Sequence, residues 1–483
     1  DIIVVLSHDE FAWNYRELEV ITCSFLANLS SLSLGTMIGW QSPTIPQLQS
    51  ENPPVGNEPM TNEAASWLTG ITCITAALTS LIVGTIANRF GRKMTGYLMA
   101  FALCSNWLFT VFATQQTYLF VARFFAGISG GMALFLVPLY VSEIASDGIR
   151  GMLGSLLVFL LNGGILLGYI LGALLSYRLF SIIMLALPLL YIVLFPFVPE
   201  SPVYLLRCNR INEADTSRRW SEKCCVYRKK RKSWTFRDDR RTSCQRCFET
   251  KQRSKDCSLP WGYSVDNNFV YVGRYTETIF KISGSSLSPN SSAIIVGVIQ
   301  VFGSCLSTTL VERVGRRPLL LTSCLGMGTC HFVLGVFCYL QTLGYDVSQF
   351  SWISIVALSI YMIAYGLGMG PGPYVISSEI LSRDVASSIV TLGMFTAWGM
   401  AFVVVKLFPS VLALLGMHGC FFLFGIFCAT TFAFIFILIP ETKGQPRQVI
   451  LDRLNGVFYS LDNKQYVSSN EITKRNAPLP ELI

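Results

Sequence analysis

The chain has 483 residues, of which 52% are hydrophobic and only 14% are charged. Soluble proteins carry about a quarter charged residues, so this composition excludes a soluble globular protein and indicates a polytopic membrane protein held in the lipid bilayer. The net charge of +8 does not indicate nucleic acid as a partner, because the excess of Lys and Arg is concentrated in a single stretch of the chain.

Apolar runs recur along the whole chain. Each is about 20 residues long, which is the length that a helix needs to cross the hydrocarbon core of a bilayer. They predict an all-α membrane protein with twelve transmembrane helices, of which the seventh is the weakest. Their expected ranges are 20–42, 66–88, 94–114, 117–140, 152–176, 179–198, 262–284, 291–311, 316–340, 352–378, 385–413 and 417–439.

One basic motif occurs twice. Gly84–Lys93 reads GTIANRFGRK, and Thr309–Pro318 reads TLVERVGRRP. Each copy lies between the second and third apolar runs of its half, which indicates a duplicated protein. Parallel duplication of a six-helix half is typical of the major facilitator fold. We therefore expect two pseudo-repeated six-helix bundles.

The expected domains are an N-terminal bundle over 1–198, a cytoplasmic linker over 199–261, a C-terminal bundle over 262–444 and a cytoplasmic tail over 445–483. Lys and Arg mark one side of the spans, so the positive-inside rule places both termini in the cytosol. The tail is polar, and we expect it to be disordered. Asn290 begins an Asn-Ser-Ser sequon on the outer face. It is either a glycosylation site or an unused sequon too close to the membrane.

Seven motifs carry a resemblance to one family. They are GTIANRFGRK, RFFAGISGG (123–131), YVSEIASDGIRG (140–151), PESP (199–202), ERVGRR (312–317), GMGPGPY (368–374) and PETKG (440–444). In this order and spacing they resemble the sugar porter family of the major facilitator superfamily, and GWQSP and ASWLTG are most similar to its insect-type facilitated trehalose and sugar transporters. The resemblance implies transport of a sugar such as trehalose or a hexose across the plasma membrane by alternating access.

Charged residues of both signs lie at the predicted cytoplasmic ends of the spans in both halves. They are Arg89, Arg92, Glu143, Arg150, Glu312, Arg316 and Glu379. We expect them to form an inter-helix charge network that holds the inner side of the transporter shut and breaks when it opens. The alternative is a set of solvated loop charges that contribute little individually.

The stretch 365–381 is rich in Gly and Pro and cannot form a regular helix. Broken helices at membrane depth occur where the backbone lines a cavity, so this stretch predicts a hinge beside a binding site. The candidate sugar contacts are Gln41, Asn162, Gly370, Pro373, Tyr374 and Trp398. Helix packing is the alternative role for Asn162, and packing of the hinge is the alternative for Tyr374.

The chain departs from the family at several sugar-binding positions. The family's Gln of helix 5 falls at Val158, Ala397 replaces its usual Asn, and Tyr374 stands where it usually has Trp. A non-transporting sugar-responsive receptor, or an inactive relative, is therefore the alternative function. Proton-coupled relatives use an Asp in helix 1, and Gln41 occupies that place here. This favours a uniporter over a symporter.

Residues 215–274 do not resemble the family and are crowded with Arg, Lys and Cys. One hypothesis is that this segment is translated out of frame, because the alternative frame allows the family's paired Gln at the opening of helix 7. Cys244 and Cys247 lack a second pair at zinc-site spacing. With no nucleophile–base pair or phosphate-binding loop evident either, we expect no metal, no cofactor and no enzymatic activity, and the sequence specifies no oligomeric state.

Overall fold

The computed structural model describes residues 7–145, 149–208, 210, 289–345, 350, 352–370, 372, 383–439, 441, 443, 457–460 and 465–468. The predicted seventh helix and the stretch 215–274 with its cysteine pair lie outside these residues, as do Pro373, Tyr374 and Glu379.

The first half of the chain forms seven α-helices before its linker. They are α1 (Ser7–Gly39), α2 (Gln41–Leu48), α3 (Asn62–Phe90), α4 (Arg92–Val111), α5 (Gln116–Ile144), α6 (Arg150–Leu174) and α7 (Tyr177–Leu194). A short 3-10 helix, Phe195–Phe197, and the short helix α8 (Pro202–Arg207) follow. The described part of the second half contains α12 (Pro289–Val314), α13 (Arg316–Thr342), α14 (Trp352–Ala364), the π-helical turn η4 (Tyr365–Met369) and α16 (Arg383–Leu438).

The α16 segment is two spans joined at Gly416, whose backbone leaves the helical region with φ 67°. Counted in this way, the described residues contain 11 helices long and apolar enough to cross a membrane. The all-α fold expected from the apolar runs is confirmed. The expectation of a disordered tail is wrong over one stretch, because β1 (Val457–Ser460) and β2 (Gln465–Ser468) pair as an antiparallel hairpin.

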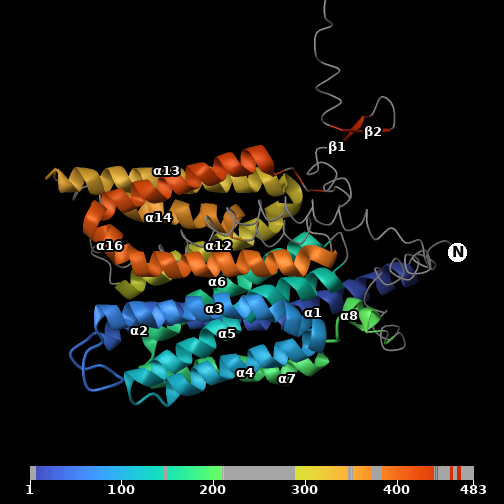
Figure 1. Cartoon of the computed structure of the whole chain (residues 1–483), viewed down its shortest axis with the longest axis horizontal. Coiled ribbons are helices and arrows are strands. Elements are labelled where there is room, and N and C mark those ends of the chain that lie inside the picture. The colour runs from blue at the N-terminus through green and yellow to red at the C-terminus, as the bar shows by residue number, and fades with distance from the viewer. Residues whose placement is uncertain are drawn as a thin grey trace, which may run out of the picture.

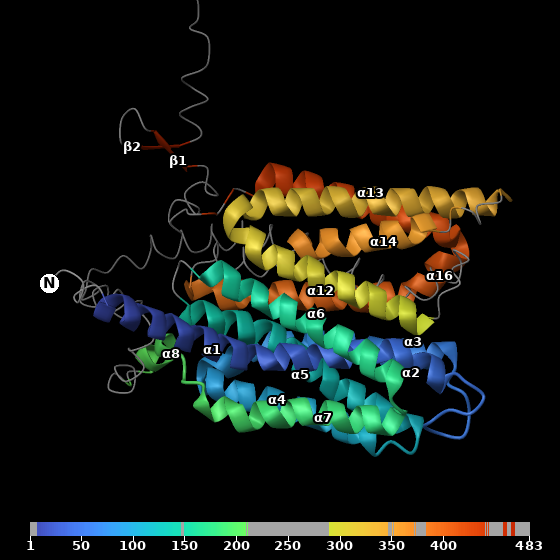
Figure 2. The same cartoon turned by 180° about the vertical axis from the view of Figure 1, so that it is seen from behind.

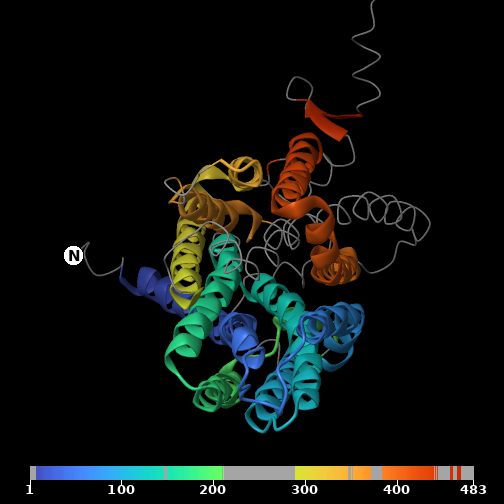
Figure 3. The ribbon, with the colours of Figure 1, turned by 90° about the vertical axis from the view of Figure 1, so that its left-hand side faces the viewer.

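The helices form two bundles that lie side by side (Figure 1), and the view from behind shows the same division (Figure 2). In the first bundle α1 packs on α6, and α5 packs on α3 and α4; in the second, α13 packs on α14 and α16. Each bundle has its own core of buried apolar side chains. The main contacts between the bundles are those of α3 with α16 and of α6 with α12. Seen end-on, the blue-to-green helices and the yellow-to-red helices form two separate groups (Figure 3).

Glycine allows the close packing of α1 on α6. A Cβ added at Gly35 would lie 2.0 Å from the carbonyl oxygen of Leu161, and one added at Gly164 would lie 2.1 Å from that of Leu32. Small residues let the backbones of membrane helices approach in this way. Backbone contact between α1 and α6 therefore depends on the absence of a side chain at both positions.

The duplicated basic motif forms the same turn twice. Gly91 joins α3 to α4 with φ 94°, and Gly315 joins α12 to α13 with φ 106°. This region of φ strongly favours glycine. The two turns lie at the same end of the molecule (Figure 1), which we call the basic end.

Candidate functional site

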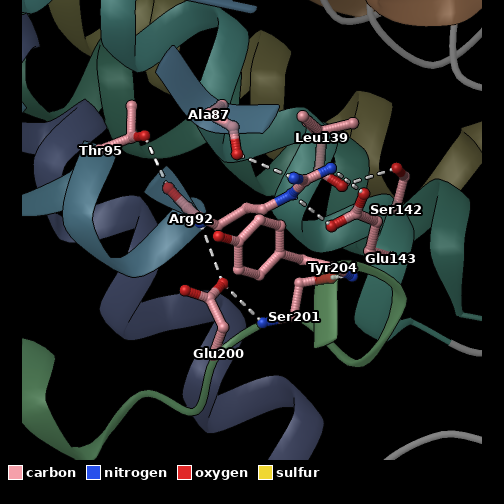
Figure 4. Close-up of polar contacts among 10 residues, drawn as sticks. Ala87, Arg92, Thr95, Leu139, Ser142, Glu143, Glu200, Ser201 and Tyr204 are labelled. Carbon is pink, nitrogen blue, oxygen red and sulfur yellow. Dashed lines mark hydrogen bonds and ion pairs between the residues drawn. The ribbon is translucent and has the colours of Figure 1, made fainter. Parts of the chain in front are cut away.

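A buried ion pair lies at the basic end of the first bundle. The Nε of Arg92 donates to Oε2 of Glu143 at 3.0 Å, and its Nη2 donates to Oε1 at 2.7 Å. This two-point geometry is the strong form of a charge-assisted hydrogen bond. The third guanidinium nitrogen, Nη1, donates to the carbonyl oxygen of Ala87 at 3.0 Å (Figure 4). These hydrogen bonds of Arg92 hold α4 against α5 and against the last turn of α3.

Glu200, which follows the α7 segment, caps the start of α4. Its carboxylate accepts hydrogen bonds from the backbone N–H groups of Arg92 at 3.0 Å and Lys93 at 3.1 Å. A carboxylate at a helix N-terminus satisfies orphan donors and interacts favourably with the helix dipole. The Tyr204 ring of α8 lies 5.4 Å from the Arg92 guanidinium, and its hydroxyl donates to the carbonyl oxygen of Arg89 at 3.2 Å. Figure 4 shows Glu200 and Tyr204 beside Arg92.

The second bundle repeats this cap. Glu441 accepts hydrogen bonds from the backbone N–H groups of Arg316 and Arg317, both at 3.1 Å. The Lys443 ammonium also donates a hydrogen bond to the carbonyl oxygen of Arg313 at 2.5 Å. The roles of Glu200 and Glu441 were not predicted from the sequence. The available signal was the repetition of Pro-Glu at the end of each half, in PESP and PETKG.

The predicted charge network is described only in part. Arg92 and Glu143 form the ion pair, whereas Arg89 is exposed, lies over the Phe90 ring at 5.5 Å and forms no ion pair with a described residue. Arg316 is buried beside the Glu441 cap. Glu379 and the side chains of Arg150 and Glu312 lie outside the described residues, so the part of the network that would join the two bundles stays a prediction.

Buried polar side chains meet where α6 packs on α12, between the two bundles. Asn162 donates from Nδ2 to the hydroxyl of Ser304 at 2.6 Å, and its Oδ1 accepts from Nε2 of Gln300 at 2.8 Å. All three residues are at most 2% exposed. Asn162 was a predicted contact, whereas Gln300 and Ser304 were missed. The sequence feature that could have identified them is a pair of polar residues one helical turn apart in an apolar span. Polar residues within a membrane span are costly and usually functional.

The predicted break in helix 10 is confirmed. Regular α-helix ends at Ala364, and η4 follows as a π-helical turn. Hydroxyl groups from neighbouring helices satisfy the freed backbone: Ser307 donates to the carbonyl oxygen of Leu367 at 2.7 Å, and Ser323 donates to that of Ala364 at 2.6 Å. Such re-satisfaction is what allows irregular backbone at membrane depth.

Gly370, at the end of η4, lies against the first bundle. A Cβ added there would lie 3.4 Å from Cγ1 of Val158 in α6. The end of η4 therefore lies beside Val158, the position at which the resemblance places the family's helix 5 Gln. Pro373 and Tyr374, the two further predicted contacts on this stretch, lie outside the described residues.

Trp398 of α16 reaches into the first bundle. Its ring atom Cζ2 would be 3.7 Å from a Cβ on Gly130 of α5, and the indole packs at the edge of the first core. Its N–H is buried and has no hydrogen-bond partner among the described residues. A buried donor of this kind usually has a partner in the functional state.

Gln41 lies within the first bundle at the start of α2. The hydroxyl of Thr69 in α3 donates to its Oε1 at 3.3 Å. Near by, the fully buried guanidinium of Arg123 stacks on the Trp40 ring at 4.0 Å and donates to the carbonyl oxygen of Met37 at 3.3 Å. No carboxylate pairs with Arg123 in the described part of the chain. An aromatic face and a carbonyl dipole thus stabilise this buried cation.

The bundles also touch where α3 packs on α16, and the contact extends along most of α3. Towards the basic end, a Cβ on Gly84 would lie 3.1 Å from the Thr391 hydroxyl. Towards the opposite end, the ammonium of Lys406 lies 3.9 Å from the centre of the Trp67 ring, a cation–π contact across the bundle interface. The bundles are therefore closed against each other along this pair of helices.

Comparison with known proteins agrees with this architecture. The family described as "Sugar (and other) transporter" matches residues 23–450, which is nearly the whole chain. The chain belongs to this family. The apolar helices and this family together identify a multi-pass membrane protein. Asn290 of the predicted sequon stands in the first turn of α12; its side chain lies outside the described residues, and glycosylation stays a prediction.

Relatives of this chain include insect proteins. The facilitated trehalose transporter Tret1 of Apis mellifera ligustica is 29% identical over 465 residues, which cover 93% of this chain and 91% of the relative. Tret1 of Drosophila pseudoobscura pseudoobscura is 28% identical over 90% of this chain. This chain spans about half the length of the Drosophila protein, 51%. The predicted resemblance to insect trehalose transporters is confirmed at this level of identity.

Solved structures share the fold. The proton:xylose symporter XylE, bound to 6-bromo-6-deoxy-D-glucose, superposes with a TM-score of 0.73 at 21% identity, over 91% of this chain and 100% of that one. The inward-open form of XylE from E. coli superposes with a TM-score of 0.60 at 21% identity, over 90% and 99%. The major facilitator fold predicted from the duplicated motif is confirmed.

Proposed function

We propose that this sugar transporter carries a neutral sugar, such as trehalose or a hexose, across the plasma membrane as a uniporter by alternating access. The observation that carries the proposal is the buried set Asn162, Gln300 and Ser304 between the two bundles. Duplicated transporters bind their substrate near the bilayer midplane, at the interface of the repeats. Amides and hydroxyls donate and accept hydrogen bonds without charge, which suits the hydroxyl groups of a sugar.

Two further features support a sugar as the substrate. The Trp398 indole presents an apolar face, and its N–H lacks a described partner. Aromatic rings of this kind combine an apolar surface with a polar tip, which suits the C–H face and the hydroxyl edge of a pyranose ring. The π-helical turn η4, which ends beside α6, supplies a hinge at the same interface. In this proposal Gln41, which contacts Thr69 inside the first bundle, influences the site indirectly.

Uniport is favoured by the chemistry of α2 and α5. Gln41 stands where proton-coupled relatives carry an Asp, and a carboxamide takes up no proton in the physiological range. Arg123 has no carboxylate partner among the described residues, so no acid–base pair is available there to couple proton movement to sugar. Each transport cycle would then move sugar alone, and uptake would not follow the proton gradient.

Positive residues orient the protein in the membrane. Arg92, Lys93, Arg316 and Arg317 lie at the basic end, so the positive-inside rule places this end and both termini in the cytosol. The Arg92–Glu143 pair and the Glu200 and Glu441 caps would then brace the cytoplasmic side of both bundles. Opening that side would require the two braced units to move apart as rigid bodies.

A sugar-responsive receptor without transport is the second candidate. It is favoured by two apolar side chains, Val158 and Ala397, which are 3% and 6% exposed and stand where the family usually has amides. Fewer polar groups would leave sugar binding weaker or absent. Sugar binding without flux would distinguish this function from that of a carrier.

Uptake of radiolabelled glucose and trehalose in oocytes tests the proposal. We expect saturable uptake of at least one sugar, equal in mildly acidic and neutral medium, by the chain as printed. A second variant carries 215–274 in the alternative reading frame. Uptake by that variant alone would mean that the segment as printed prevents transport. Absence of flux from both variants, with both present at the cell surface, would contradict the proposal and favour the receptor.

A further inference from the structure

We propose that Asn162 is a positioning residue, which orients the Gln300 carboxamide towards the sugar and does not itself contact the sugar. This inference rests on the proposed function, because it concerns the same site. In this proposal α6 affects sugar recognition by orienting a residue of α12 and not by binding the sugar directly.

Each polar atom of Asn162 already has a partner on α12. Its Nδ2 donates to Ser304, and its Oδ1 accepts from Gln300, at 2.6 and 2.8 Å. The side chain is 1% exposed, so water does not compete for these atoms. Rotating the carboxamide by half a turn would place its NH2 group against the NH2 group of Gln300. The Asn162 amide therefore has one favourable orientation, and both of its partners belong to the other bundle.

Ser304 closes the arrangement into a ring. It receives the Asn162 bond and donates its own hydroxyl hydrogen to the backbone carbonyl of Gln300 at 3.0 Å. Gln300 and Ser304 are four residues apart in α12, so their side chains leave the same face of the helix. The ring thus contains the Gln300 side chain, the Asn162 side chain, the Ser304 hydroxyl and one turn of α12 backbone.

The Gln300 carboxamide uses only its nitrogen in this ring. Its Nε2 is held by Asn162, and its carboxamide oxygen accepts no hydrogen bond from any described residue. A carboxamide oxygen has two acceptor lone pairs, and a sugar hydroxyl would supply a donor for them. Val158, one turn before Asn162, is apolar and faces Gly370. In this proposal the Asn162 side chain affects sugar binding only by orienting the Gln300 carboxamide.

The test is a double-mutant cycle on sugar uptake with Asn162→Leu and Gln300→Leu, repeated with a set of monodeoxy glucose analogues. We expect Asn162→Leu to raise KM for glucose by about two- to tenfold, the effect of losing one neutral hydrogen bond, with kcat nearly unchanged. In the Gln300→Leu background, adding Asn162→Leu is expected to change KM little. Both single variants should lose discrimination against the same deoxy analogue.

A direct sugar contact by Asn162 would give a different result. The two substitutions would then raise KM independently, and each would relax discrimination at a different hydroxyl. Gly163→Ala is the matched control in α6, because its Cβ would meet only Cδ1 of Leu32, at 3.8 Å. We expect this variant to keep the wild-type KM.

A swap of the two amides keeps the test decisive if Asn162→Leu fails to reach the surface. Asn162→Gln with Gln300→Asn exchanges the side-chain lengths but can restore the amide–amide hydrogen bond. We expect each single exchange to raise KM and the double exchange to lower it again. Additive losses in the double exchange would overturn the inference while leaving sugar transport by the wild type intact. No uptake by the wild type would instead overturn the proposed function.

Discussion

Replacing Glu143 with Ala is expected to produce the largest loss of stability of any single charge substitution in the first bundle. The change leaves the Arg92 side chain buried, at 3% exposure, without its carboxylate. Removing one partner of a buried ion pair typically costs about 3–5 kcal/mol, because the other charge stays uncompensated. We expect a lower unfolding temperature in detergent and little protein at the cell surface, measured by thermal unfolding and surface labelling.

Two controls separate the ion pair from a general effect of losing acidic residues. Glu51→Ala removes an exposed carboxylate from the loop after α2 and should leave the unfolding temperature near that of the wild type. Replacing both partners, with Arg92→Met and Glu143→Leu, should recover part of the lost stability, since an apolar pair removes the uncompensated charge. A Glu143→Ala protein as stable as the wild type would contradict this role for the pair.

Gly164→Ala is expected to destabilise the protein strongly although it adds only a methyl group. The new Cβ would lie 2.1 Å from the carbonyl oxygen of Leu32, so α1 and α6 would have to separate. Inserting atoms into a packed interior costs about 1–3 kcal/mol, and more when backbone must move. The measurement is the unfolding temperature of the purified protein, together with sugar uptake per molecule at the surface.

The neighbouring residue offers a matched comparison. Gly163→Ala adds the same methyl group on the same helix where only a flexible Leu32 side-chain atom lies within reach, at 3.8 Å. Alanine is a better helix former than glycine by about 1 kcal/mol, so this variant should be as stable as the wild type or slightly more so. Equal losses from both substitutions would mean that close backbone contact between α1 and α6 does not decide stability.

The sequence predicted the membrane helices well, because the bilayer sets a length that apolar runs must meet. The run 66–88 lies within α3, and 316–340 lies within α13. The break in helix 10 could also be predicted, since Gly and Pro at 366–373 exclude regular helix for local reasons. The repeat of the Gly91 and Gly315 turns followed from a motif that is visible in both halves.

Partners distant in the sequence could not be predicted in the same way. Glu200 caps α4 across 108 residues, and Asn162 meets Gln300 across 138. Such pairings depend on how the helices pack, which hydropathy and spacing do not specify. Asn162 was recognised as a polar residue on a Gly-rich helix face, yet its partners came from the other bundle. Gln300 was overlooked because one amide in an apolar run barely changes the hydropathy.

Counterflow in proteoliposomes tests the central claim, sugar transport by alternating access, most directly. Vesicles containing the purified protein are loaded with unlabelled sugar and diluted into a trace of the labelled sugar, with the same pH on both sides. A carrier that alternates between two faces should accumulate label inside transiently above its equilibrium level, because unlabelled sugar occupies the returning sites. The account predicts this overshoot without any proton gradient. Label that enters without overshoot, or overshoots only when an inward proton gradient is imposed, would contradict it.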